Sequence, residues 1–143
     1  MKKVTKVLFL LSVLTVGLVA CSKEKQIKHW LTRKDGKWYV TSMDYKYYNN
    51  NTLQQSSHIT SPGDFVFSKN GSVVTTLNVN GAPQKTSGTW TNTKHDLTIM
   101  SNGEASVYTI QGKPKKDKMT VQTTDYYPTG EKEEYTLYME LAK

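Results

Sequence analysis

The sequence predicts an all-β protein, an antiparallel up-and-down β-barrel of about eight strands preceded by a short helix. Three observations support this. The apolar period changes from 3.6 to 2 after residue 36, turn signals then recur about every ten residues, and nearly all connections are short. Parallel neighbours would need crossovers of about a dozen residues, so consecutive strands should pair antiparallel. Closing eight such strands removes the exposed sheet edges.

The chain begins with a basic segment, MKKVTK, followed by an uncharged apolar run, VLFLLSVLTVGLVA. This run is shorter than the roughly 20 residues that span a membrane, so it is typical of a secretory signal peptide. The run ends in Leu18-Val19-Ala20-Cys21, which resembles the lipobox of bacterial lipoproteins. The resemblance implies that residues 1–20 are a signal peptide and that Cys21 is the site of lipid attachment.

In such lipoproteins the cysteine sulfur bears diacylglycerol, and its amino group bears a further acyl chain such as palmitate. Two or three chains anchor a protein stably, whereas one chain binds only marginally. Ser22, rather than aspartate, follows Cys21, and by analogy with enteric lipoproteins this favours the outer membrane of a bacterial envelope. Both orientations fit the sequence, with the domain either on the periplasmic face of this membrane or on the cell surface.

Residues 21–33 should comprise the lipidated cysteine, a polar tether over residues 22–26 and a short helix. Ile27, Trp30 and Leu31 have the i, i+3, i+4 spacing of one helical face. A helix this short should lean on an apolar surface, because short helices are marginal alone. The barrel domain should then extend over residues 34–143.

The expected strands are runs rich in β-branched and aromatic residues. They occupy residues 37–48, 64–68, 72–79, 86–92, 96–101, 104–111, 118–127 and 133–143. Asn-Gly pairs at 70–71 and 102–103 predict tight hairpins. Residues 49–63 have no apolar period, so they are expected to form a long loop, either a lid or slack chain.

The opening of this domain resembles that of lipocalins, because Gly36-Lys37-Trp38 matches their Gly-x-Trp motif. The segments FVFSKNGSVVT, SGTWT, LTIM and YTIQ resemble small lipocalin-like lipoproteins of Gram-negative envelopes. The resemblance covers about residues 34–143 and implies a calycin-like barrel. The chain lacks the disulfide of classical lipocalins, since Cys21 is its only cysteine.

A barrel of eight strands is wide enough to be filled by side chains or to hold one small ligand. The sequence offers few large apolar residues, so a filled interior is the more economical interpretation. The residues proposed to contact a ligand are bulky and lie on the expected inward faces: Trp38, Phe65, Phe67, Trp90, Tyr108 and Tyr135.

Tyrosines gather at two expected strand ends, where they could contact a partner protein. The partner-binding candidates are Tyr45, Tyr47, Tyr48, Tyr126 and Tyr127. The alternative is that tyrosine is simply favoured in strands.

The charge argues against nucleic acid as a partner. Removing the signal peptide removes three lysines and lowers the formal net charge from +7 to +4. The remaining lysines are scattered or mixed with acids, and Arg33 is the only arginine, whereas nucleic-acid surfaces cluster both.

No catalytic or metal motif stands out. His29, His58 and His95 lack metal-ligand spacing and are interpreted as surface or turn residues. There is no G-x-S-x-G elbow and no phosphate-binding glycine pattern. We therefore expect no enzyme activity, no metal and no cofactor. A small hydrolase remains the less favoured alternative, with carboxylates near strand ends as its candidate groups.

The function expected from the sequence is ligand or partner binding at the membrane. The protein would be an outer-membrane lipoprotein whose lipocalin-like domain binds a small apolar ligand in the barrel mouth or an envelope protein on its rim. The alternative is a solid-core interaction module, such as an inhibitor or accessory subunit of an envelope complex.

Overall fold

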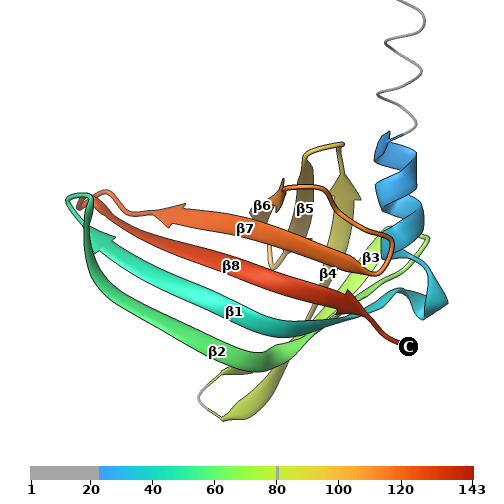
Figure 1. Ribbon diagram of the computed structural model, residues 1–143, viewed down its shortest axis with the longest axis horizontal. Helices are drawn as coiled ribbons and strands as arrows, with labels where there is room; N and C mark the ends of the chain where they lie inside the picture. The colour runs from blue at the N-terminus through green and yellow to red at the C-terminus, as the bar shows by residue number, and fades with distance from the viewer. Residues whose placement is uncertain (1–22, 80) are drawn as a thin grey trace, which may run out of the picture.

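A computed structural model describes residues 23–79 and 81–143 and contains a closed barrel of eight antiparallel strands in sequence order (Figure 1). β1 pairs with β8 to close it. This confirms the predicted fold class. The strands are β1 Lys37–Asn49, β2 Thr52–Phe67, β3 Ser72–Val79, β4 Ala82–Asn92, β5 Asp96–Ser101, β6 Glu104–Gln111, β7 Lys118–Tyr126 and β8 Glu131–Leu141.

The prediction of a long loop at residues 49–63 is wrong, because most of this segment belongs to strand β2. Asn50 and Asn51 form a tight turn with φ of 48° and 60°, and β2 begins at Thr52. Asparagine tolerates this left-handed conformation better than most residues. Residues 52–61 of β2 are exposed throughout. Because neither face of this segment is buried, its side chains need not alternate between apolar and polar residues. The sequence of this strand therefore resembles that of a loop.

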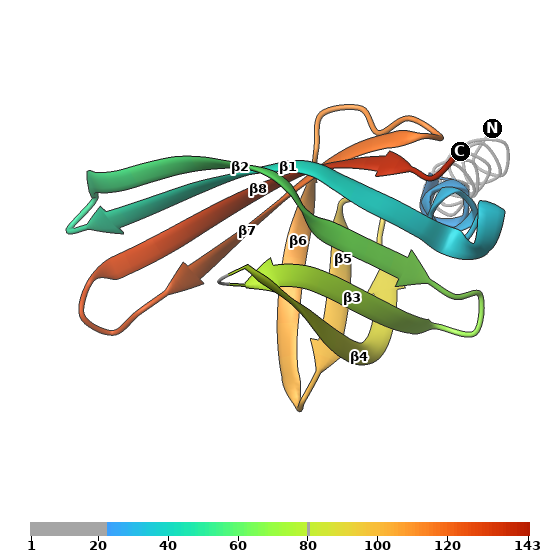
Figure 2. The same ribbon diagram turned by 90° about the horizontal axis from the view of Figure 1, so that it is seen from below.

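Four strands continue beyond the barrel as a long ribbon in the order β2, β1, β8, β7 (Figure 2). β1 pairs with both neighbours along its length, to Asn49. β2 meets β3 over Gly63–Phe67, and β7 meets β6 over residues 120–122. Thr52–Pro62 of β2 and Thr123–Tyr126 of β7 therefore lie in the ribbon, whose base forms one wall of the barrel's open end.

A bulge in β1 sets which side chains face the interior. The register shifts between Val40 and Ser42 against both neighbouring strands. A bulge adds one residue and so reverses the alternation of faces beyond it. Trp38 and Val40 face inward before the bulge, and Met43 faces inward after it, where it pairs with buried Leu137.

The opposite end of the barrel is closed by the N-terminal helical segment, residues 23–31. Ile27 and Leu31 have no exposed surface, and the indole Nε1 of Trp38 donates a 3.1 Å hydrogen bond to the Leu31 carbonyl. The predicted amphipathic helix is thus present, and it includes residues 23–26, which we expected to belong to the tether. Cys21 and the signal peptide lie outside the described residues.

The short 3-10 turn η1, Lys34–Gly36, joins the helical segment to β1. Gly36 has φ +69°, and a Cβ there would overlap the backbone carbonyl of Phe67. Only glycine combines that conformation with so close an approach. This explains physically why glycine stands two residues before Trp38.

The core fills the closed half of the barrel. Among residues 23–79 and 81–143, sixteen buried apolar residues form this core, and the segment 22–143 contains all of them. The last strand behaves as its alternation predicts, since Leu137, Met139 and Leu141 are buried. The members are Ile27, Leu31, Trp38, Val40, Phe65, Phe67, Val73, Trp90, Leu97, Ile99, Ile110, Met119, Val121, Leu137, Met139 and Leu141.

Candidate functional site at the open end of the barrel

The open end contains a pocket of about 410 Å³ with a largely apolar wall. It lies where β6 and β7 separate beyond their three paired positions. A pocket of this size lies within the range that holds small ligands. Its lining residues come from six strands: Met43, Pro62, Leu77, Asn78, Ser106, Tyr108, Thr123, Asp125, Tyr135 and Leu137.

Aromatic rings connect the pocket to the core beneath it. The rings of Tyr108 and buried Phe65 form a T-shaped pair with centroids 6.5 Å apart. Tyr135 packs against Tyr45 with centroids 5.2 Å apart. Burial, reinforced by the negative charge of Asp125, raises the pKa of the Tyr108 phenol above its ordinary value. Tyr108 is therefore a neutral hydrogen-bonding group at the floor of the pocket.

Above the pocket, three tyrosines converge on one carboxylate. Glu133 accepts hydrogen bonds from Tyr45 at 3.0 Å, Tyr127 at 3.0 Å and Tyr135 at 2.7 Å. These donors, Tyr135 foremost, hold the pKa of Glu133 below its ordinary value. Burial and the adjacent Glu133 raise the pKa of Tyr135. Glu133 is thus a fixed anion at the rim, and one of the rings that hold it, Tyr135, also forms part of the pocket wall.

Glu131 forms a similar group nearer the tip of the ribbon. It accepts hydrogen bonds from the phenol of Tyr47 and from the Thr129 hydroxyl. Both bonds hold the Glu131 pKa below its ordinary value, that from Tyr47 more strongly. The inner face of the ribbon therefore presents ionised carboxylates among tyrosine rings.

The structure separates the six ligand-binding candidates into two groups. Tyr108 and Tyr135 line the pocket. The other four, Trp38, Phe65, Phe67 and Trp90, are buried in the core at 0–4% exposure. Phe67 packs on Phe65 and on Trp90, with centroids 5.8 Å and 5.4 Å apart. None of these four residues lines the pocket, and Phe65 contacts the lining through Tyr108.

The five partner-binding candidates lie along the ribbon, on both faces. Tyr45, Tyr47 and Tyr127 bond to the carboxylates of the inner face. Tyr48 lies on the outer face, where the ammonium group of Lys132 sits 4.3 Å from its ring centroid. Tyr126 is 78% exposed.

Several pocket residues were not singled out from the sequence. Met43 and Leu77 are spaced like ordinary strand residues, and Met43 faces inward only because of the bulge before it. Glu133 belongs to an acidic cluster that resembles solvated charge near a turn, and Asp125 is one of the strand-end carboxylates considered only for the less favoured hydrolase. Their inward orientation follows from the pairing register, in which Asp125 lies opposite Glu133 and Glu133 opposite Tyr47.

A larger hollow of about 570 Å³ lies at the closed end, between the helical segment and the β2–β3 turn. Its lining is mostly polar and charged, including His29, Arg33, Lys34 and Lys69. It lies outside the barrel, on the far side of the core from the open end. For an apolar ligand the open-end pocket is the better candidate.

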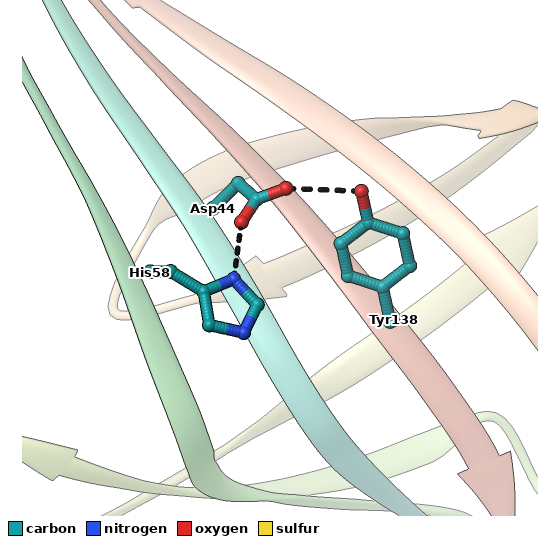
Figure 3. A network of polar contacts seen from close by, with 3 residues as sticks. All are labelled: Asp44, His58 and Tyr138. Atoms are coloured by element: carbon teal, nitrogen blue, oxygen red, sulfur yellow. Dashed lines mark hydrogen bonds and ion pairs between the residues drawn. The ribbon is translucent and has the colours of Figure 1, made fainter.

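The outer face of the ribbon contains a hydrogen-bonded group of three side chains (Figure 3). His58 Nδ1 lies 2.6 Å from Asp44 Oδ1, and the Tyr138 phenol donates to Asp44 Oδ2 at 3.0 Å. Both contacts, that with His58 more strongly, hold the Asp44 pKa below its ordinary value. The group joins β2, β1 and β8 in an exposed position, and we interpret it as a structural link. His29, His58 and His95 are all exposed, as predicted.

Within residues 23–79 and 81–143, no three histidine, cysteine or acidic side chains are grouped so that they could hold a metal ion. In the same part of the chain, no helix has the length and apolar character needed to cross a membrane.

Comparison with known proteins gave weak structural likenesses. No protein-family profile and no curated protein matched the chain. An uncharacterized protein from Bacteroides eggerthii DSM 20697 aligns at a TM-score of 0.42 with 12% identity, over 73% of this chain and 97% of that one. Lobster apocrustacyanin A1 aligns at a TM-score of 0.45 with 15% identity, over 83% of this chain and 69% of that one. The architecture follows from the barrel itself, a closed sheet of eight strands in up-and-down order.

Proposed function

We propose that this protein is a non-catalytic binding protein that takes a small apolar ligand into the open end of its barrel. The observation that supports this most strongly is the pocket of about 410 Å³ between Leu77, Leu137, Met43 and the ring of Tyr108. Apolar pockets with a few convergent polar groups are the usual form of small-molecule sites. Polar groups at the rim, such as Asn78 and Thr123, would orient the ligand.

We further propose that the barrel is held at the outer membrane by lipid on Cys21. The support is the sequence alone: a basic start, an apolar run, and Leu18-Val19-Ala20-Cys21 in that order. Labelled palmitate should be incorporated into the wild-type chain and not into Cys21→Ser. Absence of label in the wild type, with a known lipoprotein labelled in parallel, would contradict the anchor and leave the binding proposal intact.

Ligand binding can be tested on the segment 22–143 with the neutral fluorescent probe N-phenyl-1-naphthylamine. We expect its fluorescence to rise on binding and to fall when 1-decanol displaces it. Ser106 is an exposed residue on the pocket wall, so Ser106→Trp should fill the pocket with little effect on folding. We expect this variant to lose at least about tenfold in probe affinity, because an indole occupies the ligand's volume.

The matched control is Ser87→Trp. Ser87 is exposed and pairs with Val74, on the face of β3 opposite buried Val73. The control should bind the probe as the wild type does. Equal loss in both variants, or no binding by the wild type, would contradict the proposed function.

A further inference from the structure

The inner face of the ribbon is strongly asymmetric in charge. Asp125, Glu131 and Glu133 share this face, since Asp125 lines the pocket and pairs with Glu133 across β7 and β8. The nearby lysines point the other way. Lys132 pairs with Tyr48 and reaches Glu134 on the outer face, and Lys46 lies opposite Glu134. A chain with a net positive charge thus concentrates negative charge beside its pocket.

Two of these carboxylates are directly opposed. Asp125 and Glu133 are cross-strand partners, and like charges in that position repel each other. Glu133 is compensated by its three tyrosine hydrogen bonds. Asp125, in contrast, faces the pocket, where its neighbours include Thr123, Ser106 and the apolar wall. Within the described residues, no cation is paired with Asp125.

The rings around these carboxylates suit the same type of ligand group. The rings of Tyr45 and Tyr135 pack together with their centroids 5.2 Å apart, and Tyr135 forms part of the pocket wall. Tyrosine faces attract cations, most strongly where water is partly excluded. Asp125 would supply a full negative charge, and a charge-assisted hydrogen bond to an ammonium group is stronger than one to a neutral group.

We propose that the ligand is a cationic amphiphile, with its apolar body in the pocket and a protonated amine at the rim between Asp125 and the tyrosine rings. This inference rests on the proposed function and adds the head-group chemistry to it. An alkyl carboxylate would place its charge against Asp125 and Glu133, so the site should reject it. A neutral alcohol of equal length should bind through its chain alone.

The test compares decylamine, 1-decanol and decanoate as competitors of N-phenyl-1-naphthylamine on the segment 22–143 at pH 7. Decylamine is protonated at this pH and decanoate is ionised. We expect decylamine to bind at least about fivefold more tightly than decanol, and decanoate more weakly than either. Raising the salt concentration should reduce the amine's advantage and leave decanol unchanged, because salt screens exposed charges. This measurement needs no variant.

Asp125→Asn should lower the affinity for decylamine about three- to tenfold and change that for decanol by less than about twofold. Asp117→Asn is the matched control, since Asp117 is an exposed carboxylate in the loop at the closed end. It should leave both affinities unchanged.

The outcomes separate the two proposals. If decanol binds but the affinity for decanoate equals or exceeds that for decylamine, the amine inference is overturned and the proposed apolar site is retained. The same conclusion follows if Asp125→Asn lowers the affinities for decanol and decylamine equally. If decylamine binds equally well to Ser106→Trp, it binds elsewhere and the inference is also overturned. If none of the three competitors binds, both proposals fail.

Discussion

The helical segment at the closed end should contribute a large part of the barrel's stability. Leu31 is the last residue of this segment and is fully buried, and its carbonyl accepts the hydrogen bond from Trp38. Leu31→Ala removes three buried carbons, which costs about 2.4 kcal/mol in transfer free energy at roughly 0.8 kcal/mol per group. The cavity left behind adds to this, and Leu→Ala changes at such sites cost about 3–5 kcal/mol.

Urea unfolding of the segment 22–143, followed by tryptophan fluorescence, measures this loss. The control is Lys28→Ala, an exposed position one helical turn away, which should change the free energy of unfolding by less than about 0.5 kcal/mol. Because Leu31 lies at the far end of the core, folded Leu31→Ala should also bind the fluorescent probe normally. A loss below about 1 kcal/mol would show that the helical segment is not part of the core.

Four further changes test other parts of the structure. Glu133→Gln should destabilise the fold at pH 7 and approach the stability of the wild type as the pH falls. The folded-state pKa of Glu133 is depressed, so its contribution is present above the unfolded value of 4.5 and is lost as the pH falls through the folded-state pKa; a difference that grows on acidification would refute this. Gly36→Ala should cost about 2 kcal/mol or more in chemical unfolding, because the added Cβ overlaps a neighbouring carbonyl; wild-type stability would contradict it. Asp44→Asn should cost less than about 1 kcal/mol in the same assay, since the group is exposed, and a larger loss would show that the outer-face group is more than a surface link. Cys21→Ser should release the protein from membranes on fractionation, and its retention there would contradict lipid anchoring.

The sequence was sufficient to predict the barrel because most strands have one buried face. Leu137, Met139 and Leu141 alternate as a half-buried strand should, and Asn102-Gly103 adopts the two positive φ angles expected of a tight hairpin. The motif at Gly36 and Trp38 correctly marked the start of β1.

The ribbon could not be predicted in the same way. Solvent covers both faces of residues 52–61, so no apolar period distinguishes that strand from a loop. The bulge after Val40 reverses the faces of β1, and nothing in the local residue pattern marks it. Without that bulge and the β7–β8 register, the sequence could not show that Asp125 and Glu133 lie together beside the pocket.

The claim that the open end binds an apolar ligand is tested most directly by methyl NMR of the segment 22–143 titrated with 1-decanol. We expect shifts at Met43, Leu77 and Leu137, which line the pocket, and none at Leu31 and Leu97, which are buried in the core. No shifts at saturating decanol, or shifts at Leu31 instead of Leu77, would contradict it.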